Sequence, residues 1–280
     1  MHLVPSFSAL TPEAVSFRFE LSARLGGEWL PWVAADAIGP TVFDPLPSAR
    51  TALSAEIDEF TTPVPLEAIR LRLRWRGDSA ALRSPWLIAL SASDQQPSPL
   101  TVASMPPQGT RLRVPAISQM VVGGSSAMRI CSPTSVAMVL GYWGCEVSAL
   151  SVAAEAFHAA TDRYGVWPAA IAAAARHDVA GYLLRFPDWP SAAWCLEQGM
   201  PVVASIRFSA GELQGAPLTE TSGHLVVLTG YEGGHVLVND PAAAGDDGVP
   251  RRYLRSEFER VWLQRGGIGY VLFRPPRARG

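Results

Sequence analysis

The segment ICSPTSVAMVLGYWG, residues 130–144, constrains the fold more than any other part of the chain. From Val136 to Trp143 apolar residues stand on almost every side of the predicted helix, so protein must surround it. Pro133 suits the first helical turn, where its missing N–H costs no hydrogen bond, and Gly144 is well placed to end the helix. The sequence therefore predicts a buried central helix that begins at residue 132 or 133, with Cys131 at or near its N-cap.

The first hundred residues have the pattern of short β-strands. Residues 15–21 and 69–76 alternate between apolar and polar side chains, and residues 86–90 form a short apolar run. Gly and Pro clusters separate these runs, which predicts an all-β, sandwich-like accessory domain over residues 1–105. The arginines at alternate positions of residues 70–76 are interpreted as a solvated strand face, with an anion site as the alternative.

The character of the chain changes after residues 94–108, a Pro-, Ser- and Gln-rich stretch that we interpret as a linker. Helices are predicted over residues 131–143, 147–160, 167–177 and 190–198, and strands over 201–206, 224–230 and 235–239. Helices followed by an antiparallel sheet are typical of an α+β fold. We therefore predict a second domain over residues 106–280.

Composition narrows the classes of function. A chain of 280 residues has room for two domains. Its net charge of −2 gives no electrostatic reason to expect nucleic acid or an acidic membrane as partner. No apolar run is long enough to span a bilayer, and the N-terminus lacks the pattern of a signal peptide. We expect a soluble protein, cytoplasmic as the sequence is printed, with export left open. The use of arginine without lysine is typical of a GC-rich, bacterial genome.

Cys131 is the strongest candidate for a reactive group. The chain has three cysteines, Cys131, Cys145 and Cys195, and no CxxC pair that would indicate a zinc or thioredoxin-type site. A helix N-terminus offers unpaired N–H groups and a partial positive charge, which stabilise the reactive thiolate and can supply part of an oxyanion hole. On this segment alone, a buried structural thiol is an equal alternative.

A cysteine nucleophile needs a base, and His224 is the best-placed histidine. It opens the most hydrophobic strand of the chain, directly after Gly223. The other histidines have ordinary positions in the sequence: His2 in an irregular N-terminal end, His158 in an alanine-rich helix, His177 near a helix C-terminus and His235 at the start of a hairpin strand.

The base in turn needs a group that orients it. Asp240 or Asn239, at the end of the next hairpin strand, can accept a hydrogen bond from His224. Counting the hairpin register places Asp240 nearer to Val227 than to His224, so Asp240 would have to act from the strand end. Gln119 precedes Cys131 and can supply a second oxyanion donor through its side-chain amide.

The order of Gln119, Cys131, His224 and Asp240 resembles that of papain-like cysteine peptidases, and more narrowly the C39-like peptidase family. The matching segments are residues 114–119, 131–144, 199–203, 223–231, 238–241 and 257–262. The resemblance covers about residues 110–275 and leaves out the first hundred. One departure is Ser132, which stands where the family often has glycine.

The resemblance implies a cysteine peptidase on a papain-like fold, acting on a peptide or protein without a metal or organic cofactor. Cys131 would attack a carbonyl carbon, His224 would move the proton, Asp240 would orient His224, and Gln119 with the Cys131 N–H would hold the oxyanion. Two alternatives stay open: an amidase or acyl transferase with the same residues, and a non-catalytic peptide-binding relative. The N-terminal domain would bind substrate, dock the enzyme to a surface or occlude the cleft.

Overall fold

The computed structural model describes residues 1–47, 51–78, 81, 83–94 and 109–276. The linker predicted over residues 94–108 lies outside the described residues from residue 95 on. The strands before it are β1 (His2–Ala9), β2 (Ser16–Leu25), β3 (Glu28–Trp29), β4 (Val33–Ala34), β5 (Ser54–Ala55), β6 (Phe60–Thr61), β7 (Ala68–Arg76) and β8 (Trp86–Ser93). They include the three strands predicted in this part of the chain.

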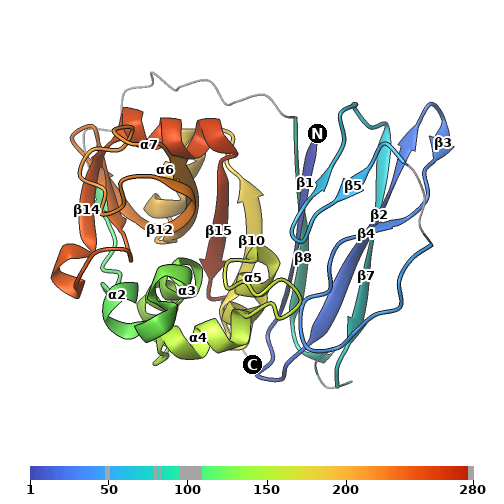
Figure 1. Ribbon diagram of the computed structural model, residues 1–280, viewed down its shortest axis with the longest axis horizontal. Coiled ribbons are helices and arrows are strands. Elements are labelled where there is room, and N and C mark those ends of the chain that lie inside the picture. The colour runs from blue at the N-terminus through green and yellow to red at the C-terminus, as the bar shows by residue number, and fades with distance from the viewer. Residues whose placement is uncertain (48–50, 79–80, 82, 95–108, 277–280) are drawn as a thin grey trace.

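These N-terminal strands form two antiparallel sheets that face each other (Figure 1). One sheet has the order β5-β6-β1-β8, and the other joins β7, β2, β3 and β4 around β2. Apolar side chains at alternate positions, such as Leu3 and Phe7 of β1 and Phe17 and Phe19 of β2, fill the space between the sheets. These side chains form the face of each strand that points to the other sheet.

The rest of the chain surrounds a seven-stranded antiparallel sheet. Its strands are β9 (Thr110–Arg111), β10 (Ala180–Arg185), β11 (Val202–Phe208), β12 (Thr221–Glu232), β13 (His235–Asn239), β14 (Pro250–Leu254) and β15 (Ile268–Phe273). The helices are α2 (Gln119–Val122), α3 (Cys131–Tyr142), α4 (Ala149–Ala156), α5 (Trp167–Ala175), α6 (Trp189–Glu197) and α7 (Arg255–Trp262), with short 3₁₀ turns η1 (Gly124–Arg129), η2 (Asp246–Gly248) and η3 (Leu263–Arg265). No helix in these described ranges has the length and apolar character that crossing a bilayer requires.

The sheet separates two layers of helices. Its strand order is β10-β15-β11-β12-β13-β14, and β9 adds to β12. Helices α3, α4 and α5 pack on one face, while α6 and α7 pack on the other (Figure 1). The result is a mixed fold with antiparallel sheets, in agreement with the α+β class predicted for this part of the chain.

Helix α3 is the buried central helix that the sequence predicts. Residues Val136–Leu140 are at most 1% exposed, and the helix packs against α4 and β12. Gly144 follows its C-cap with φ +80°, the left-handed conformation that glycine adopts at low cost. Cys131 is the first residue of α3 and not the residue before it, and the N-cap position belongs to Ile130.

Two predictions about histidines are wrong. His158 does not lie in a helix, because α4 ends at Ala156. Its backbone N–H bonds to Arg163 O and its ring bonds to Thr161 Oγ1 at 2.7 Å and to Ala37 O at 2.9 Å, contacts that outweigh local helix propensity. His2 is not in an irregular N-terminal end but pairs with Ser93 and Thr61 in β1.

Strand β10, which local periodicity did not predict, joins the two parts of the chain. Its N–H groups at Gly181, Leu183 and Arg185 donate to serine hydroxyls of β1 and β8 at 3.0–3.2 Å. The N-terminal sheet therefore satisfies the donors along the edge of β10. The core of the N-terminal sheets also includes Val166 and Ala169 beside and within α5. A domain division at residues 105/106 stays a prediction.

A fully buried carboxylate lies under the polar face of β2 and β7. Glu20 accepts hydrogen bonds from Arg18 Nη2 at 2.5 Å and Arg72 Nε at 2.6 Å, with Arg74 Nε at 3.6 Å. Burial raises the pKa of Glu20, but the hydrogen bonds and charges of Arg18 and Arg72 bring it below its ordinary value of 4.5. The folded state therefore favours the ionised carboxylate.

Replacing this carboxylate tests its contribution to stability. We expect Glu20→Gln to lower the free energy of unfolding by about 2 kcal/mol at pH 7, because the variant leaves three arginines without their charge partner, one of them largely buried. The folded pKa is depressed, so the difference should be complete above pH 4.5 and shrink as the pH falls through the folded value. Urea unfolding at pH 7 and pH 3 measures it, and an equal loss at both values would contradict the assignment.

Candidate active site

Cys131 lies beside the part of β12 that extends past the end of β13, where β12, among the described strands, is paired only with β11. Strand β13 ends at Asn239, opposite Val227, so the backbone of Leu225 has no partner in β13. Helix α3 occupies this place: Ser135 Oγ donates to Leu225 O at 3.0 Å, and the Leu225 N–H faces the Cys131 thiol. The unpaired edge of β12 thus holds the N-terminus of α3 next to the strand that carries His224.

His224 and Asp240 form a buried hydrogen-bonded pair. His224 Nε2 lies 2.7 Å from Asp240 Oδ1, and their side chains are 3% and 1% exposed. His224 shares a strand face with Val226, and Asp240 shares a face with Val238, and both faces pack in the core under α6 and α7. Asp240 follows the last residue of β13, so it contacts His224 from the strand end, as the register count requires.

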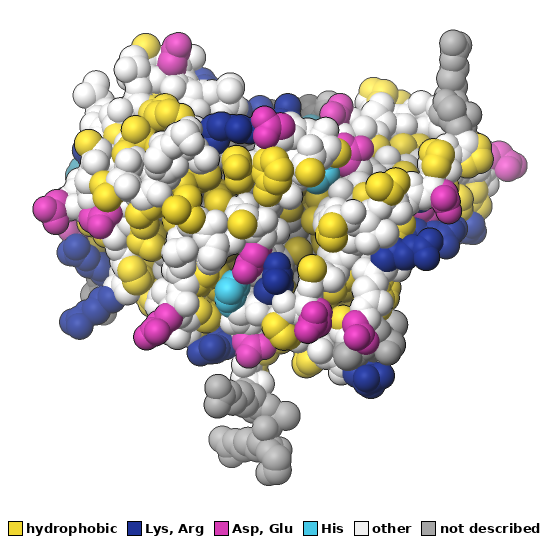
Figure 2. Space-filling view, turned by 60° about the horizontal axis from the view of Figure 1, so that its bottom comes forward, with side chains coloured by type: hydrophobic (Ala, Val, Ile, Leu, Met, Phe, Trp, Pro, Cys, Tyr) yellow, Lys and Arg dark blue, Asp and Glu magenta, His cyan; other side chains and the backbone are white. Residues whose placement is uncertain are grey.

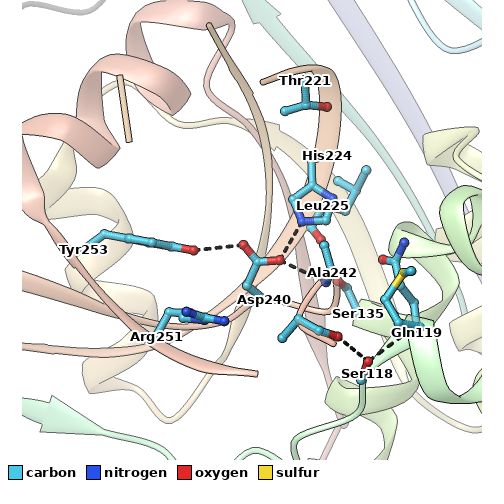
Figure 3. A network of polar contacts seen from close by, with 12 residues as sticks. Ser118, Gln119, Ser135, Thr221, His224, Leu225, Asp240, Ala242, Arg251 and Tyr253 are labelled. Atoms are coloured by element: carbon cyan, nitrogen blue, oxygen red, sulfur yellow. Dashed lines mark hydrogen bonds and ion pairs between the residues drawn. The ribbon is translucent and has the colours of Figure 1, made fainter. Parts of the chain in front are cut away.

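Two further groups hold the Asp240 carboxylate in place (Figure 3). The Ala242 N–H donates to Oδ1 at 3.0 Å, and the Tyr253 hydroxyl donates to Oδ2 at 2.9 Å. Burial raises the pKa of Asp240, but His224 and these donors bring it below its ordinary value. Sequence reasoning missed Tyr253, because only the β13–β14 register, which pairs it with Val236, brings it to this face.

Asn239, the alternative orienting residue, has a different role. Its Nδ2 donates to Val114 O at 3.2 Å and to Pro115 O at 3.0 Å. Since its amide is engaged with residues 114–115, Asp240 is the residue of this pair that contacts His224.

His224 and Cys131 each shift the pKa of the other. Burial raises the pKa of Cys131, but the hydrogen bond and charge of His224, with the Leu225 and Ser132 N–H groups, bring it below its ordinary value. Burial lowers the pKa of His224, but Asp240 and Cys131 raise it to about 10. Because Asp240 occupies Nε2, Nδ1 is the ring nitrogen that can serve Cys131. These contacts therefore favour the thiolate of Cys131 beside the imidazolium of His224.

Gln119 is the first residue of α2 and is 3% exposed. Its Nε2 donates to Ala127 O at 2.6 Å, four residues before Cys131, while its Oε1 is buried without a hydrogen-bond partner among the described residues. Nε2 carries two hydrogens, and the bond to Ala127 O uses one of them. Ser118 fixes the start of α2 by accepting from the Met120 N–H and donating to Ala243 O (Figure 3).

The other residues singled out in the sequence make different contacts. Ser132, the departure from the family pattern, is fully buried and its hydroxyl bonds to Tyr270 Oη at 3.1 Å. Cys145 and Cys195 are free thiols whose pKa burial raises, that of Cys195 to about 11. His177 pairs with Glu155, and His2 pairs with Glu59. Of the sequence candidates, the structure brings Cys131, His224 and Asp240 together.

Alkylation measures the reactivity that this geometry predicts. At pH 7 we expect iodoacetamide to label Cys131 at least about 10-fold faster than Cys145 or Cys195, because only Cys131 has a lowered pKa. In His224→Ala the midpoint of the pH dependence of Cys131 labelling should move above pH 9, because burial still raises the pKa of Cys131 and the imidazole that lowers it is lost. Peptide mapping after timed labelling gives the rates, and equal rates at the three cysteines would refute the coupling.

Several solved structures, among them the following two, are similar to the chain. A putative C39-like peptidase from Bacillus anthracis is 21% identical, with a TM-score of 0.46 over 61% of this chain and 100% of that chain. A double glycine motif protease from an AMS/PCAT transporter, in complex with the leader peptide, is 22% identical, with a TM-score of 0.42 over 59% of this chain and 95% of that chain. No curated protein matches. The model of the Peptidase_C39 like family matches residues 111–270, more than half of the chain, and the chain therefore belongs to this family.

Proposed function

We propose that the protein is a cysteine peptidase in which Cys131 is the nucleophile, His224 the base and Asp240 the residue that orients the base. The observation that carries the proposal is the buried His224–Asp240 hydrogen bond of 2.7 Å, beside the thiol whose pKa His224 lowers. Membership of the Peptidase_C39 like family supports the reaction class.

Acylation begins with attack of the Cys131 thiolate on a peptide carbonyl carbon. The tetrahedral oxyanion would accept hydrogen bonds from the Cys131 N–H, at the unpaired start of α3, and from the second Nε2 hydrogen of Gln119. His224, already protonated, then gives its proton to the leaving amine as the C–N bond breaks. The products of this step are a thioester on Cys131, a neutral imidazole and the free amine.

Deacylation reverses these roles. Neutral His224 takes a proton from a water molecule, whose oxygen attacks the thioester carbonyl, and the same donors hold the second oxyanion. Collapse of this intermediate breaks the C–S bond, releases the carboxylic acid and restores the thiolate–imidazolium pair. Asp240 keeps Nε2 engaged through both steps, so that Nδ1 always faces the reaction.

Substitution separates these roles. We expect Cys131→Ala to abolish peptide cleavage, Asp240→Asn to lower kcat/KM by about 10²–10⁴-fold and Gln119→Ala by about 10²–10³-fold. Cys145→Ser is the matched control and should stay within about 2-fold, because Cys145 is a free thiol with a raised pKa. Mass spectrometry of a defined peptide library measures cleavage. Full activity in Cys131→Ala would refute the proposal.

The acyl acceptor is tested separately. In H₂¹⁸O a peptidase should place one ¹⁸O in each new carboxyl terminus, because water completes the reaction. An acyl transferase would instead join the acyl group to an added amine, and an amidase would release ammonia or a non-peptide amine. Dominant amine adducts at millimolar amine would replace the peptidase assignment with acyl transfer while leaving the roles of Cys131 and His224 intact.

A further inference from the structure

Strand β7 has an open edge. It pairs with β2 along its whole length, from Ala68 opposite Arg24 to Arg76 opposite Ser16. Within the described parts of the chain, no strand pairs with its other edge. In an antiparallel pair, alternate residues direct their N–H and C=O groups away from the partner. The outer edge of β7 therefore presents a row of backbone donors and acceptors to a further strand.

A row of arginines follows this edge. Arg70, Arg72, Arg74 and Arg76 share the face of β7 that points away from the core, while the intervening apolar side chains pack on the N-terminal core. Three of the four arginines are exposed, and Arg72 is half-buried. In Figure 2 dark-blue side chains gather along the right-hand flank, on the N-terminal half of the molecule.

Aromatic rings hold these guanidinium groups. The Arg70 guanidinium carbon lies 3.6 Å from the centroid of the Trp29 ring, and that of Arg72 lies 4.2 Å from the Trp32 ring. A guanidinium over a ring face keeps its N–H groups available at its edges, and the stacking reduces the freedom that a ligand would have to remove. The row is therefore partly pre-organised.

The charge of the row is not balanced by its neighbours. Glu20 is the carboxylate that contacts it, and it is already shared between Arg18, Arg72 and Arg74. For Arg70 and Arg76 the described residues supply no carboxylate within 4.0 Å. A chain with a net charge of −2 thus carries a strip of concentrated positive charge at an unpaired strand edge.

An extended acidic peptide matches both features. Side chains on one face of a strand recur about every 6.6–6.8 Å, and a strand added to β7 would place its own alternate side chains opposite the arginines. Main-chain hydrogen bonds would give affinity and the acidic side chains would give selectivity. We infer that the open edge of β7 binds an extended segment of the peptide substrate with Asp or Glu at alternate positions. That this peptide is a substrate rests on the proposed peptidase function, whereas its binding to β7 does not.

Binding is measured with the full chain carrying Cys131→Ala, so that no probe is cleaved. The probe is a fluorescein-labelled peptide of five Glu-Thr repeats, and its neutral counterpart has five Gln-Thr repeats. We expect the acidic peptide to bind at least about 10-fold more tightly by fluorescence anisotropy. The double substitution Arg70→Gln with Arg74→Gln should weaken it by about 10-fold or more, while Arg72 stays to keep Glu20 paired.

The matched control is Arg111→Gln with Arg252→Gln, which removes the same charge from exposed positions outside β7. Binding within about 2-fold of the parent in this control supports the β7 site, and an equal loss in both double variants would overturn it. Thermal unfolding confirms that both variants are folded.

A second comparison tests strand addition. The Glu-Thr peptide with every amide N-methylated keeps its charges but cannot donate to β7, so its affinity should fall by about 10-fold. Undiminished binding would refute strand addition. Polyphosphate and phosphatidylglycerol vesicles test whether any polyanion binds. If either binds more tightly per charge than the Glu-Thr peptide, and if this binding also depends on Arg70 and Arg74, the ligand of β7 is a general polyanion and not a peptide. Failure of Cys131 alkylation together with intact peptide binding would reject the peptidase function and leave the docking edge standing.

Discussion

The candidate site depends on the backbone of Leu225, whose edge β13 does not cover. Because β13 stops opposite Val227, one edge of β12 is left open just where His224 stands. A buried carbonyl without a partner is costly, and Ser135 of α3 removes that cost by donating to Leu225 O. The same contact fixes the position of the first turn of α3. The short length of β13 therefore decides where Cys131 lies relative to His224.

Burial of the charged groups would be unfavourable without the contacts around Asp240. An isolated carboxylate in a site that is 1% exposed would be neutral. Here His224, Ala242 and Tyr253 each contact it, so the ionised form is retained and the imidazolium is favoured in turn. Low exposure then strengthens each of these interactions, because water cannot screen them. The orientation of His224 and the charge of Cys131 have one physical cause.

Hydrogen bonds to serine side chains join the N-terminal strands to the seven-stranded sheet. Ser6 and Ser8 stand at positions of β1 that face β10, while Leu3 and Phe7 on the opposite face pack into the N-terminal core. Both faces of β1 are therefore buried. The serine hydroxyls accept hydrogen bonds from N–H groups of β10 that would otherwise be buried without a partner. This explains why a strand at the start of the chain packs against one near residue 180.

The sequence by itself determined the helices and strands whose buried residues follow a regular apolar pattern along the chain. The apolar surround of α3, the alternation of β2 and β7, and the placement of Cys131 at a helix start follow from side-chain order alone. It also identified His224, Asp240 and Gln119 as candidates, since a nucleophile limits which residue types can serve it. Only the tertiary structure decided that Asp240 and not Asn239 contacts His224, that Tyr253 joins the pair, and that β10 exists. Those outcomes depend on strand register, on the bulge between Leu228 and Gly230 and on where β13 ends. Register is set by long-range pairing, and a shift of one residue moves every side chain to the other face.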